Sequence, residues 1–458
     1  MFNMLRFRNE VALIDEEIQY TYGEIVEIYS QVFKDIKTRS LVGIIAGNNI
    51  ESIIAYMWAL NAKSVPLMLG AEMWGLAEIL RLYEPHFIWK PKDMEICGDI
   101  VAEFGKYVLI KNPNASNCDL CNELALLLST SGSTGSQKFV RVGYKNILEN
   151  TKAIVKYLNL TSSDSVITSL PIHYSFGLSN INTHLFVGGR VVASNESFMQ
   201  EKFWRLMQQY KVSTLAGVPY SFEMLDRIKI YQKDLPYLKR LLQAGGKLNE
   251  HLHKKFAQYA LEHNKDFFVM YGQTEASPRM GYLPPKIALE KVGAMGVAIP
   301  GGEFVLVNEN GEKINKADIV GELVYRGENV ALGYAFSGAD LHKDDEFCGV
   351  LKTGDMARFD KDGVFYIVGR KNRFVKVYGN RVSLDELEYS IKHTFMGLEC
   401  ACVGSDNKIT IFITKDLREE VKKFVVTASG LHFSAFAIQV IESLPKNSAG
   451  KIMYEALQ

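Results

Sequence analysis

The stretch LLLSTSGSTGSQK, residues 126–138, joins a short apolar run to a loop of small residues that ends in a lysine. Leu126, Leu127 and Leu128 are typical of a buried strand, and the serines, threonines and glycines that follow can turn sharply without side-chain clashes. The glycines let the main chain approach oxygen atoms closely, so backbone N–H groups and hydroxyls can converge on one anion. Because Lys138 adds a positive charge at the end of the loop, the stretch predicts a cradle for a phosphate group.

This loop differs from the Walker type of phosphate loop. The Walker pattern GxxxxGK[ST] places a glycine directly before the lysine, and here Gln137 holds that position. A flexible Ser/Gly surface loop is the alternative interpretation of the stretch taken alone. The choice between the two therefore depends on what the rest of the chain carries.

The overall composition favours a globular protein that acts on small molecules. The 458 residues predict two or three domains at about 150 residues each, and 47% hydrophobic residues can bury a large core. Lysine plus arginine and aspartate plus glutamate both number 52, which argues against an extended nucleic-acid surface. The first residues lack the apolar core of a signal peptide, and no apolar run approaches the ~20 residues of a membrane helix. We therefore expect a cytoplasmic protein without a membrane span.

The cysteines and histidines do not predict a metal site. Cys118 and Cys121 are spaced as in zinc and redox sites, but no second pair with that spacing follows. Reduced thiols in a cytosolic protein are the simpler interpretation. None of the nine histidines forms an HExxH motif.

The order of apolar runs predicts an α/β fold. LVGIIAGNN (41–49), IESIIAYMWALNA (50–62) and SVPLML (64–69) are typical of a strand, a helix and a second strand, and this rhythm recurs downstream. It indicates layered parallel sheets with helices on their faces, which we assign to a large N-terminal domain, residues 1–370. Short strands and turns predict a β-rich subdomain at about 291–370. Residues 371–458 are expected to form a small, mobile α+β domain.

Five further stretches place small, charged and aromatic residues at expected strand ends or in loops. They are LPIHYSFGL (170–178), QAGGKL (243–248), MYGQTEAS (270–277), LKTGDMARF (351–359) and LPKNSAGKI (444–452). Together with the loop at 126–138, and in this order, they resemble the motifs of adenylate-forming enzymes. That superfamily of AMP-dependent synthetases and ligases includes acyl-CoA synthetases, the adenylation domains of peptide synthetases, and luciferases. The resemblance covers nearly the whole chain.

The resemblance implies a binding site for ATP. The phosphate loop would hold the β- and γ-phosphates, and its residues are Thr130, Ser131, Gly132, Ser133, Thr134, Gly135 and Lys138. The adenine would stack on Tyr271, which is followed by Gly272, and would contact the backbone of Ala244, Gly245 and Gly246. The ribose hydroxyls would bind the two carboxylate oxygens of Asp355, with Arg370 nearby on the nucleotide.

The same resemblance assigns Thr274 to the α-phosphate and Glu275 to Mg²⁺. A carboxylate suits that task because Mg²⁺ takes hard oxygen ligands and keeps waters and phosphate oxygens as its other ligands. A helix cap and an exposed acid are the alternative interpretations of these two residues.

Lys451 is the residue that we expect to carry the chemistry. Attack of a carboxylate on the α-phosphate brings two anions together, so a cation is needed between them as the pentacoordinate centre forms. Lys451 matches the family lysine that reaches the active site during adenylation. A surface lysine of the chain's tail is the alternative.

The resemblance also implies that the C-terminal domain rotates about residues 370–372. The rotation would withdraw Lys451 and bring the Gly379 loop to the thiol. Lys376 resembles a lysine of the same segment, with an exposed basic strand as the alternative. The sequence departs from the family at the usual hinge position, which is commonly Asp or Lys but is Asn372 here.

A second departure concerns the acid substrate. Many relatives have an aromatic residue followed by a histidine after the proline, and that histidine position corresponds to Tyr174 here, with His173 one residue earlier. Either His173 or Tyr174 could gate the acyl pocket, and a purely structural histidine is the alternative. Amino-acid-activating relatives carry Phe-Asp where this chain has Phe176 and Gly177, and glycine cannot pair with an ammonium group. A carboxylic acid without an α-amino group is therefore favoured. The candidates for the pocket lining are His173, Tyr174, Phe176, Tyr220 and Gln243.

These features predict a two-step ligase. ATP and a small carboxylic acid would give an acyl-adenylate and pyrophosphate, and a thiol of CoA or of a carrier protein's phosphopantetheine would then take the acyl group and release AMP. The alternatives are an amine acceptor, which would make the protein an amide ligase, and amino-acid adenylation. A non-catalytic nucleotide-binding protein with the same fold is more remote. The acid, the acceptor and the oligomeric state stay open at this point.

Overall fold

The computed structural model describes residues 3–16, 18–34, 36, 39–73, 75–115, 119–129, 138–377, 380–405, 408–429, 431–446 and 452–457. Contacts divide the chain into two compact units. The N-terminal unit takes its residues from Met1–Thr130, Ser136–Phe304 and Tyr325–Leu351, and the C-terminal unit from Val305–Val324 and Lys352–Gln458. The domain boundary expected at residue 370 marks the point about which the C-terminal domain would rotate. A division by contacts does not test such a pivot, so that boundary stays a prediction.

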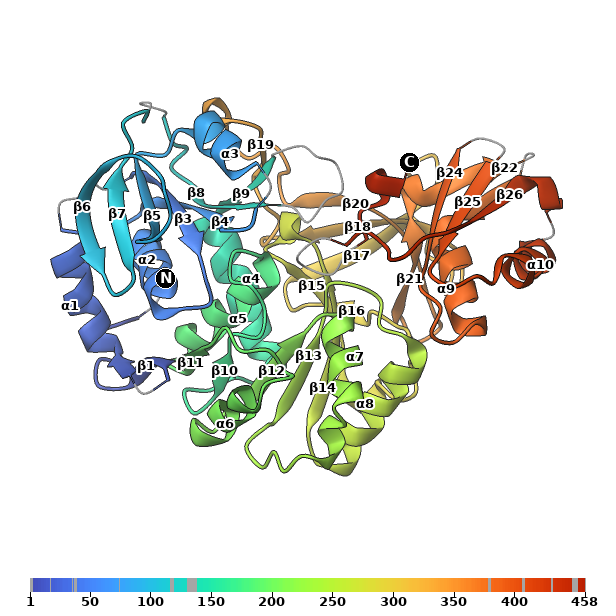
Figure 1. The fold of residues 1–458 in the computed structure, drawn as a ribbon, viewed down its shortest axis with the longest axis horizontal. Helices are drawn as coiled ribbons and strands as arrows, with labels where there is room; N and C mark the ends of the chain where they lie inside the picture. The colour runs from blue at the N-terminus through green and yellow to red at the C-terminus, as the bar shows by residue number, and fades with distance from the viewer. Residues whose placement is uncertain are drawn as a thin grey trace. The chain divides into compact units, whose positions relative to one another are not determined.

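In the described residues, two large sheets form the N-terminal unit (Figure 1). One has eight strands in the order β19-β9-β8-β4-β3-β5-β7-β6, and the other has nine in the order β16-β15-β14-β13-β12-β10-β11-β1-β2. The eight strands are β3 (Leu41–Ala46), β4 (Val65–Gly70), β5 (Phe87–Pro91), β6 (Asp99–Phe104), β7 (Tyr107–Lys111), β8 (Leu124–Ser129), β9 (Phe139–Gly143) and β19 (Gly333–Ala335). The nine strands are β1 (Val11–Asp15), β2 (Ile18–Thr21), β10 (Ser165–Ile167), β11 (Arg190–Ala193), β12 (Thr214–Gly217), β13 (Arg240–Gln243), β14 (Asp266–Gly272), β15 (Arg279–Leu283) and β16 (Val297–Ala298).

The central strands of the eight-stranded sheet are apolar along their whole length. Strands β3, β4 and β8 read LVGIIA, VPLMLG and LALLLS, and every residue in them is buried. Strand β4 runs parallel to both β3 and β8. Parallel strands covered on both faces have this composition, because neither face meets water. The strand expected at Leu126–Leu128 is therefore present as β8.

The most buried helix, α2 (Ile50–Asn61), explains how the two sheets are held together. It begins after Asn49, whose side chain accepts a hydrogen bond from the backbone N–H of Ser52, and all residues of Ile50–Leu60 are buried. A helix that is apolar all round needs cover on every side. Helix α2 finds that cover between β1 of one sheet and β3 and β4 of the other.

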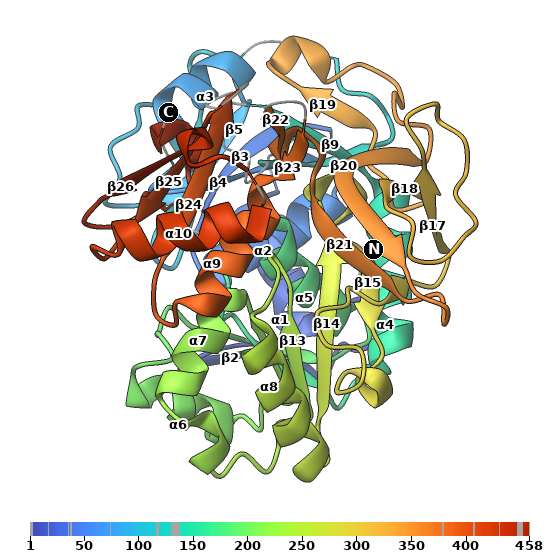
Figure 2. The same ribbon diagram turned by 90° about the vertical axis from the view of Figure 1, so that its right-hand side faces the viewer.

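The remaining helices of this unit pack around the sheets (Figure 2). They are α1 (Tyr22–Val32), α3 (Leu76–Tyr83), α4 (Tyr144–Leu158), α5 (Ser175–Phe186), α6 (Glu201–Gln209), α7 (Pro219–Arg227) and α8 (Glu250–Glu262). Like α2, helix α5 is buried along most of its length, and it contacts α4, β10 and β11. Burial begins at Gly177, so the helix enters the interior of the unit within its first turn.

The C-terminal unit has an apolar core of its own. A three-stranded sheet in the order β24-β25-β26 packs against two helices around residues such as Ile391, Ile411 and Val421. The sheet and helices are β24 (Cys400–Ser405), β25 (Lys408–Ile413), β26 (Phe436–Val440), α9 (Leu384–Thr394) and α10 (Arg418–Ser429), preceded by the hairpin β22 (Phe374–Val377) and β23 (Asn380–Ser383). A four-stranded sheet contains β17 (Gly302–Val307), β18 (Gly321–Gly327), β20 (Val350–Phe359) and β21 (Phe365–Arg370) in that order.

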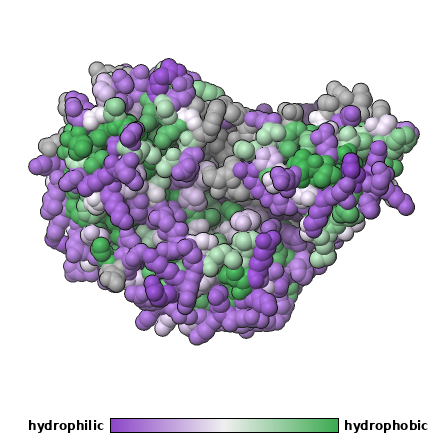
Figure 3. Space-filling view, in the orientation of Figure 1, coloured by the Kyte–Doolittle hydropathy of each residue, from purple (hydrophilic) through white to green (hydrophobic). Residues whose placement is uncertain are grey.

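Sheets and helices thus alternate as the sequence predicts, and the α/β fold class is confirmed. Hydrophilic residues cover most of the visible face of the N-terminal unit in Figure 3. None of the helices in the described part of the chain is long and apolar enough to cross a membrane.

Candidate active site

Three parallel strands bring predicted site residues to one edge of the nine-stranded sheet. Strands β12, β13 and β14 are neighbours, with Gly217 opposite Gln243 and Gln243 opposite Val269. The loop Ala244–Gly246 follows β13, and Tyr271 lies near the end of β14. The carboxyl ends of parallel strands meet at one edge of the sheet, so these segments lie along that edge. Open α/β sheets bind their ligands there.

The loop after β14 carries Thr274 and Glu275 in the short helix η2 (Thr274–Ala276). The hydroxyl of Tyr334 on β19 donates a hydrogen bond of 2.8 Å to Glu275 Oε1. The ammonium group of Lys138 lies 4.1 Å from the centre of the Tyr334 ring. One tyrosine therefore contacts both the expected phosphate-binding lysine and the expected Mg²⁺ ligand, although the two lie far apart in sequence.

Two buried asparagines fix the backbone of this loop. The side-chain amide of Asn329 donates to the carbonyl oxygens of Ala276 (2.7 Å) and Arg279 (3.0 Å), and that of Asn150 donates to Arg279 O at 2.8 Å. Both asparagines are at most 3% exposed. Amides that satisfy buried carbonyls in this way hold a loop that no regular secondary structure supports. Glu275 is therefore presented by a rigid segment.

The first turn of α5 contacts the same loop. Ser175 Oγ lies 3.0 Å from Thr274 Oγ1, a hydrogen-bonding distance for two hydroxyls. Ser175 is the first residue of a twelve-residue helix, and the N-terminus of a helix favours negative charge because its first N–H groups have no intrahelical acceptor. The two hydroxyls and the helix end thus form a polar wall that suits an anionic group.

His173 lies just before this helix and packs over the end of β4. A Cβ atom at Gly70 would be 2.9 Å from the His173 ring, so the imidazole occupies the space that the glycine leaves. The ring is tilted against that of Tyr174, with the centroids 4.3 Å apart. Burial lowers the pKa of the His173 imidazole to about 4, so the ring is neutral at neutral pH. A neutral, packed ring suits a pocket wall better than a charged ligand contact.

The other candidates for the acyl pocket lie in different environments. Phe176 packs under the guanidinium of Arg279, whose Cζ is 4.5 Å from the ring centre. Gln243 is fully buried, and its amide donates to Gly246 O at 2.9 Å, whereas Tyr220 on α7 is 53% exposed. A Cβ atom at residue 177 would lie 2.4 Å from the carbonyl oxygen of Pro171, so this backbone leaves no room for an aspartate at Gly177.

The predicted ribose-binding pair lies in the C-terminal unit. Asp355 on β20 is opposite Arg370 on β21, and Asp355 Oδ1 is 2.8 Å from Arg370 Nε. Asp355 is 2% exposed, and its backbone N–H donates to Thr353 Oγ1 at 3.0 Å. The carboxylate is thus held in a defined position by a guanidinium that is itself half exposed.

Some predicted residues lie outside the described part of the chain. They are Thr130, Ser131, Gly132, Ser133, Thr134, Gly135, Gly379 and Lys451. Asn372 belongs to the short helix η5 (Lys371–Arg373), and Lys376 belongs to β22. The roles of these residues stay predictions.

The residues present fit a magnesium ion that arrives with ATP. The structure holds no group of three or more His, Cys, Asp or Glu side chains, within the ranges it describes, that could bind a metal ion by themselves. One carboxylate, Glu275, beside the Thr274 hydroxyl suits Mg²⁺ that keeps phosphate oxygens and waters as its other ligands. When bound, the ion would neutralise phosphate charge.

Several contacts of the site have no local sequence signal. The contacts of the Thr274–Arg279 segment come from α4 (Asn150), α5 (Ser175), β19 (Tyr334) and the turn between β18 and β19 (Asn329), which fold against it. Arg279, by contrast, could have been noticed in the sequence, because it is a charged residue at the start of the otherwise apolar strand RMGYL. Arginine is rarely fully buried unless it has a partner.

The strand-end loops and the segment after β14 define the arrangement of an adenylate-forming enzyme. Residues 3–335 match the AMP-binding enzyme family, and the chain belongs to that family. The superfamily recognised from the sequence motifs is thereby confirmed.

Named relatives support the same assignment. A 2-succinylbenzoate–CoA ligase from Listeria innocua is 25% identical over 480 residues, which cover 98% of this chain and 96% of the relative. A long-chain-fatty-acid–CoA ligase from Salmonella typhimurium is 28% identical over 359 residues, 74% of this chain and 62% of the relative. Among solved structures, the o-succinylbenzoate CoA synthetase of Bacillus subtilis bound to its acyl-adenylate intermediate has a TM-score of 0.81 at 18% identity, covering 100% of this chain and 98% of that one. That likeness concerns the fold.

Proposed function

We propose that this protein activates a small carboxylic acid with ATP and transfers the acyl group to the thiol of CoA. In the first step a carboxylate oxygen bonds to the α-phosphorus of ATP and pyrophosphate leaves. In the second step the thiol sulfur bonds to the acyl carbon, the thiol proton is lost, and AMP leaves. The protein is thus an AMP-forming acid–thiol ligase that uses ATP and Mg²⁺. The observation that carries the proposal is the contact of Tyr334 with both Lys138 and Glu275, in a chain of this family.

The described residues divide the work of the first step. Glu275 would bind the Mg²⁺ of MgATP, and Tyr334 holds its carboxylate in place through the 2.8 Å hydrogen bond. The hydroxyls of Thr274 and Ser175, which lie 3.0 Å apart, would face the α-phosphate. Lys138 would compensate phosphate charge, and its ammonium rests on the Tyr334 ring in a favourable cation–π contact.

The remaining roles come from the sequence motifs. Thr130–Gly135 would hold the β- and γ-phosphates, Asp355 and Arg370 the ribose, and Ala244–Gly246 and Tyr271 the adenine. Lys451 would place its charge between the carboxylate and the α-phosphate. A pivot at Asn372, with Lys376 and Gly379 serving the thiol step, completes the proposal.

CoA is the proposed acceptor because the relatives from Listeria innocua and Salmonella typhimurium reported above are CoA ligases. A carrier-protein phosphopantetheine supplies the same thiol chemistry and is the alternative. A cytoplasmic location also stays a proposal, as does any partner beyond the acid and the thiol.

The test is carboxylate-dependent exchange of pyrophosphate into ATP, followed by mass spectrometry for a thioester when CoA is added. We expect Lys451→Ala to lower the exchange rate by a factor of about 100 or more, because one positioned charge at a phosphoryl centre contributes roughly 3 kcal/mol. Lys446→Ala is the matched control, since Lys446 lies in the same segment and pairs with Glu399 at 2.6 Å. Full exchange by Lys451→Ala, or an amide formed with an amine acceptor and no thioester formed with CoA, would contradict the proposal.

A further inference from the structure

Arg279, the first residue of β15, is a buried cation next to the candidate active site. It is 1% exposed. Its Nη2 contacts Asn180 Oδ1 at 2.8 Å and Ser179 Oγ at 3.3 Å, and its Nη1 contacts the Tyr157 hydroxyl at 3.1 Å. Its Nε is buried and has no hydrogen-bond partner. The guanidinium is thus enclosed by neutral groups and has one donor left over.

Within the described residues, Arg279 has no carboxylate partner. The two other buried arginines do: Arg141 lies 2.5 Å from Glu346, and Arg240 lies 2.8 Å from Asp164. A guanidinium keeps its charge in proteins. Burial of a charge without a counter-ion lowers the stability of the fold by roughly several kcal/mol. The retention of an uncompensated cation is therefore expected where an anion binds.

The position of Arg279 relates that anion to the reaction. Its partner Ser179 lies one helical turn after Ser175 on α5, and Ser175 contacts Thr274 at 3.0 Å. One turn advances a helix by about 5.4 Å. A small cavity of about 10 Å³ is lined by Ser175, Ser179, Ser277 and Pro278, and Pro278 directly precedes Arg279 in the chain. Ser277 Oγ is also buried without a hydrogen-bond partner.

The aromatic neighbour of Arg279 is a predicted pocket residue. The Phe176 ring lies 4.5 Å from the guanidinium carbon. Phe176 packs in the same apolar cluster as Ala244 and Met270, next to the adenine loop. A substrate that occupies the acyl pocket would therefore extend toward the guanidinium, with the aromatic ring along its side.

We propose that Arg279 binds the second carboxylate of a dicarboxylic acid substrate, and so selects diacids over monocarboxylic acids. The inference rests on the proposed function, because the first carboxylate is the one that is adenylated. A guanidinium suits the second one, since its N–H groups form a fork that matches a carboxylate, and the free Nε supplies one arm of that fork. The hydroxyl of Ser277, which lines the cavity and has no hydrogen-bond partner, supplies a further donor.

The experiment compares diacids with the same molecules after one charge is removed. Glutarate, adipate and terephthalate are each tested against their monomethyl esters, together with hexanoate and benzoate, in the pyrophosphate exchange assay. Wild-type protein is expected to show a kcat/KM at least tenfold higher for one or more diacids than for the matching ester. In Arg279→Met that ratio is expected to fall to about one, mainly through the KM of the diacid, and in Arg279→Lys it is expected to be intermediate. Met270→Leu is the matched control, because Met270 touches Arg279 but carries no charge, and it should keep the wild-type ratio.

The outcomes separate the inference from the proposed function. Should the monocarboxylic acids and esters support exchange better than the diacids in wild-type protein, the ligase assignment stands and the role of Arg279 is wrong. A diacid preference that survives in Arg279→Met would also overturn it. Absence of exchange with every acid of both series would contradict the proposed function itself. If Arg279→Met does not fold, the wild-type ratio and that of Arg279→Lys decide the question.

Discussion

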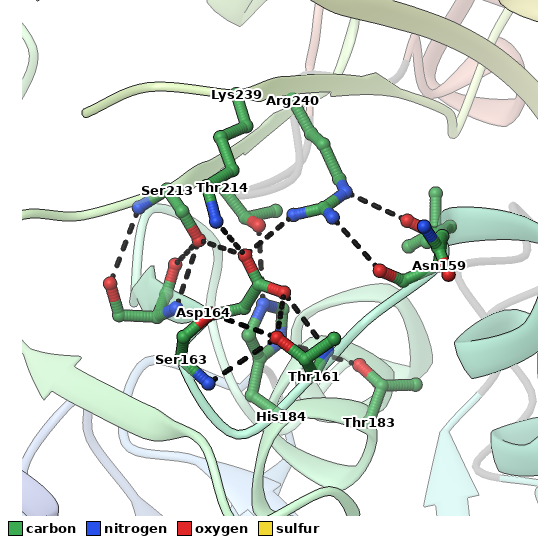
Figure 4. A network of polar contacts seen from close by, with 12 residues as sticks. Asn159, Thr161, Ser163, Asp164, Thr183, His184, Ser213, Thr214, Lys239 and Arg240 are labelled. Carbon is green, nitrogen blue, oxygen red and sulfur yellow. Dashed lines mark hydrogen bonds and ion pairs between the residues drawn. The ribbon is translucent and has the colours of Figure 1, made fainter. Parts of the chain in front are cut away.

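Two buried arginines of the same nine-stranded sheet, Arg240 on β13 and Arg279 on β15, have opposite surroundings. Arg240 lies 2.8 Å from Asp164 Oδ1 and donates through Nε to Leu158 O at 2.8 Å (Figure 4). Arg279 meets only hydroxyl, amide, thioether and aromatic groups. The first has a counter-ion built into the fold, and the second has none among the described residues.

The surroundings of Asp164 show what a completed network contains. Ser213 Oγ, Lys239 Nζ and Arg240 Nη1 all lie within 3.1 Å of Asp164 Oδ1, and the Thr161 backbone N–H lies 2.9 Å from Oδ2. Such saturation leaves no capacity for a ligand, so the Asp164 cluster supports the fold. The contrast teaches that burial alone does not identify a functional cation; an uncompensated charge with a donor to spare does.

The largest expected change in stability is at the buried ion pair of Arg240 and Asp164. Arg240→Met leaves the carboxylate of Asp164 buried without its main partner, and breaking a buried pair in this way costs roughly 3–5 kcal/mol. Urea unfolding followed by tryptophan fluorescence measures the loss, since the four tryptophans all lie in the sequence ranges of the N-terminal unit. Lys239→Met is the control, because its side chain is 53% exposed and should cost about 1 kcal/mol or less. A loss for Arg240→Met no larger than for the control would remove the contrast.

The second expected effect is a pH dependence of the same pair. Burial by itself raises the pKa of Asp164, but the hydrogen bonds from Arg240, from the Thr161 backbone and from Lys239 outweigh it and hold the pKa well below the ordinary 3.8. A depressed pKa gives stability that is present above pH 3.8 and is lost as the pH falls through the lower folded value. The difference in melting temperature between wild type and Asp164→Asn should thus be constant from pH 7 to about 4 and shrink below that. A difference that grows on acidification would show that the pair does not hold the carboxylate ionised.

The sequence predicts the fold and part of the site, and the two arginines show where such prediction ends. The apolar runs of β3, α2 and β4 follow from local periodicity, and the Thr274–Glu275 loop follows from its motif. The partner of Arg240 lies 76 residues earlier in the chain, and that of Glu275 lies 59 residues later. Which acid meets which base depends on strand order and register, and these are set by packing over the whole sheet rather than by any local pattern.

A smaller effect is expected from a single hydroxyl of the Asp164 network. Ser213→Ala removes a donor at 3.1 Å from Asp164 and the acceptor of the buried Ser165 backbone N–H at 2.9 Å. A buried donor left without its partner costs about 1–3 kcal/mol, and the other donors to Asp164 keep the loss near the lower end. Ser163→Ala, at an exposed contact with Thr161, is the matched control and should be neutral in urea unfolding. Equal losses for the two variants would mean that the buried contacts contribute no more than the exposed one.

The smallest expected change in stability is at Arg279, and it is the sharpest test of the comparison. Arg279→Met removes hydrogen bonds to Asn180, Ser179 and Tyr157, but it leaves no carboxylate unpaired and relieves the burial of a charge. The two terms oppose each other, so we expect the free energy of unfolding to change by about 1 kcal/mol or less in either direction. The melting temperature with adipate and ATP then separates the roles, because a ligand that binds only the folded state raises it. Wild type should gain more from a preferred diacid such as adipate than from its monomethyl ester, whereas Arg279→Met should gain about equally from the two. If Arg279→Met instead lost as much stability as Arg240→Met, the neutral shell of Arg279 would be as complete a structural network as the one around Asp164.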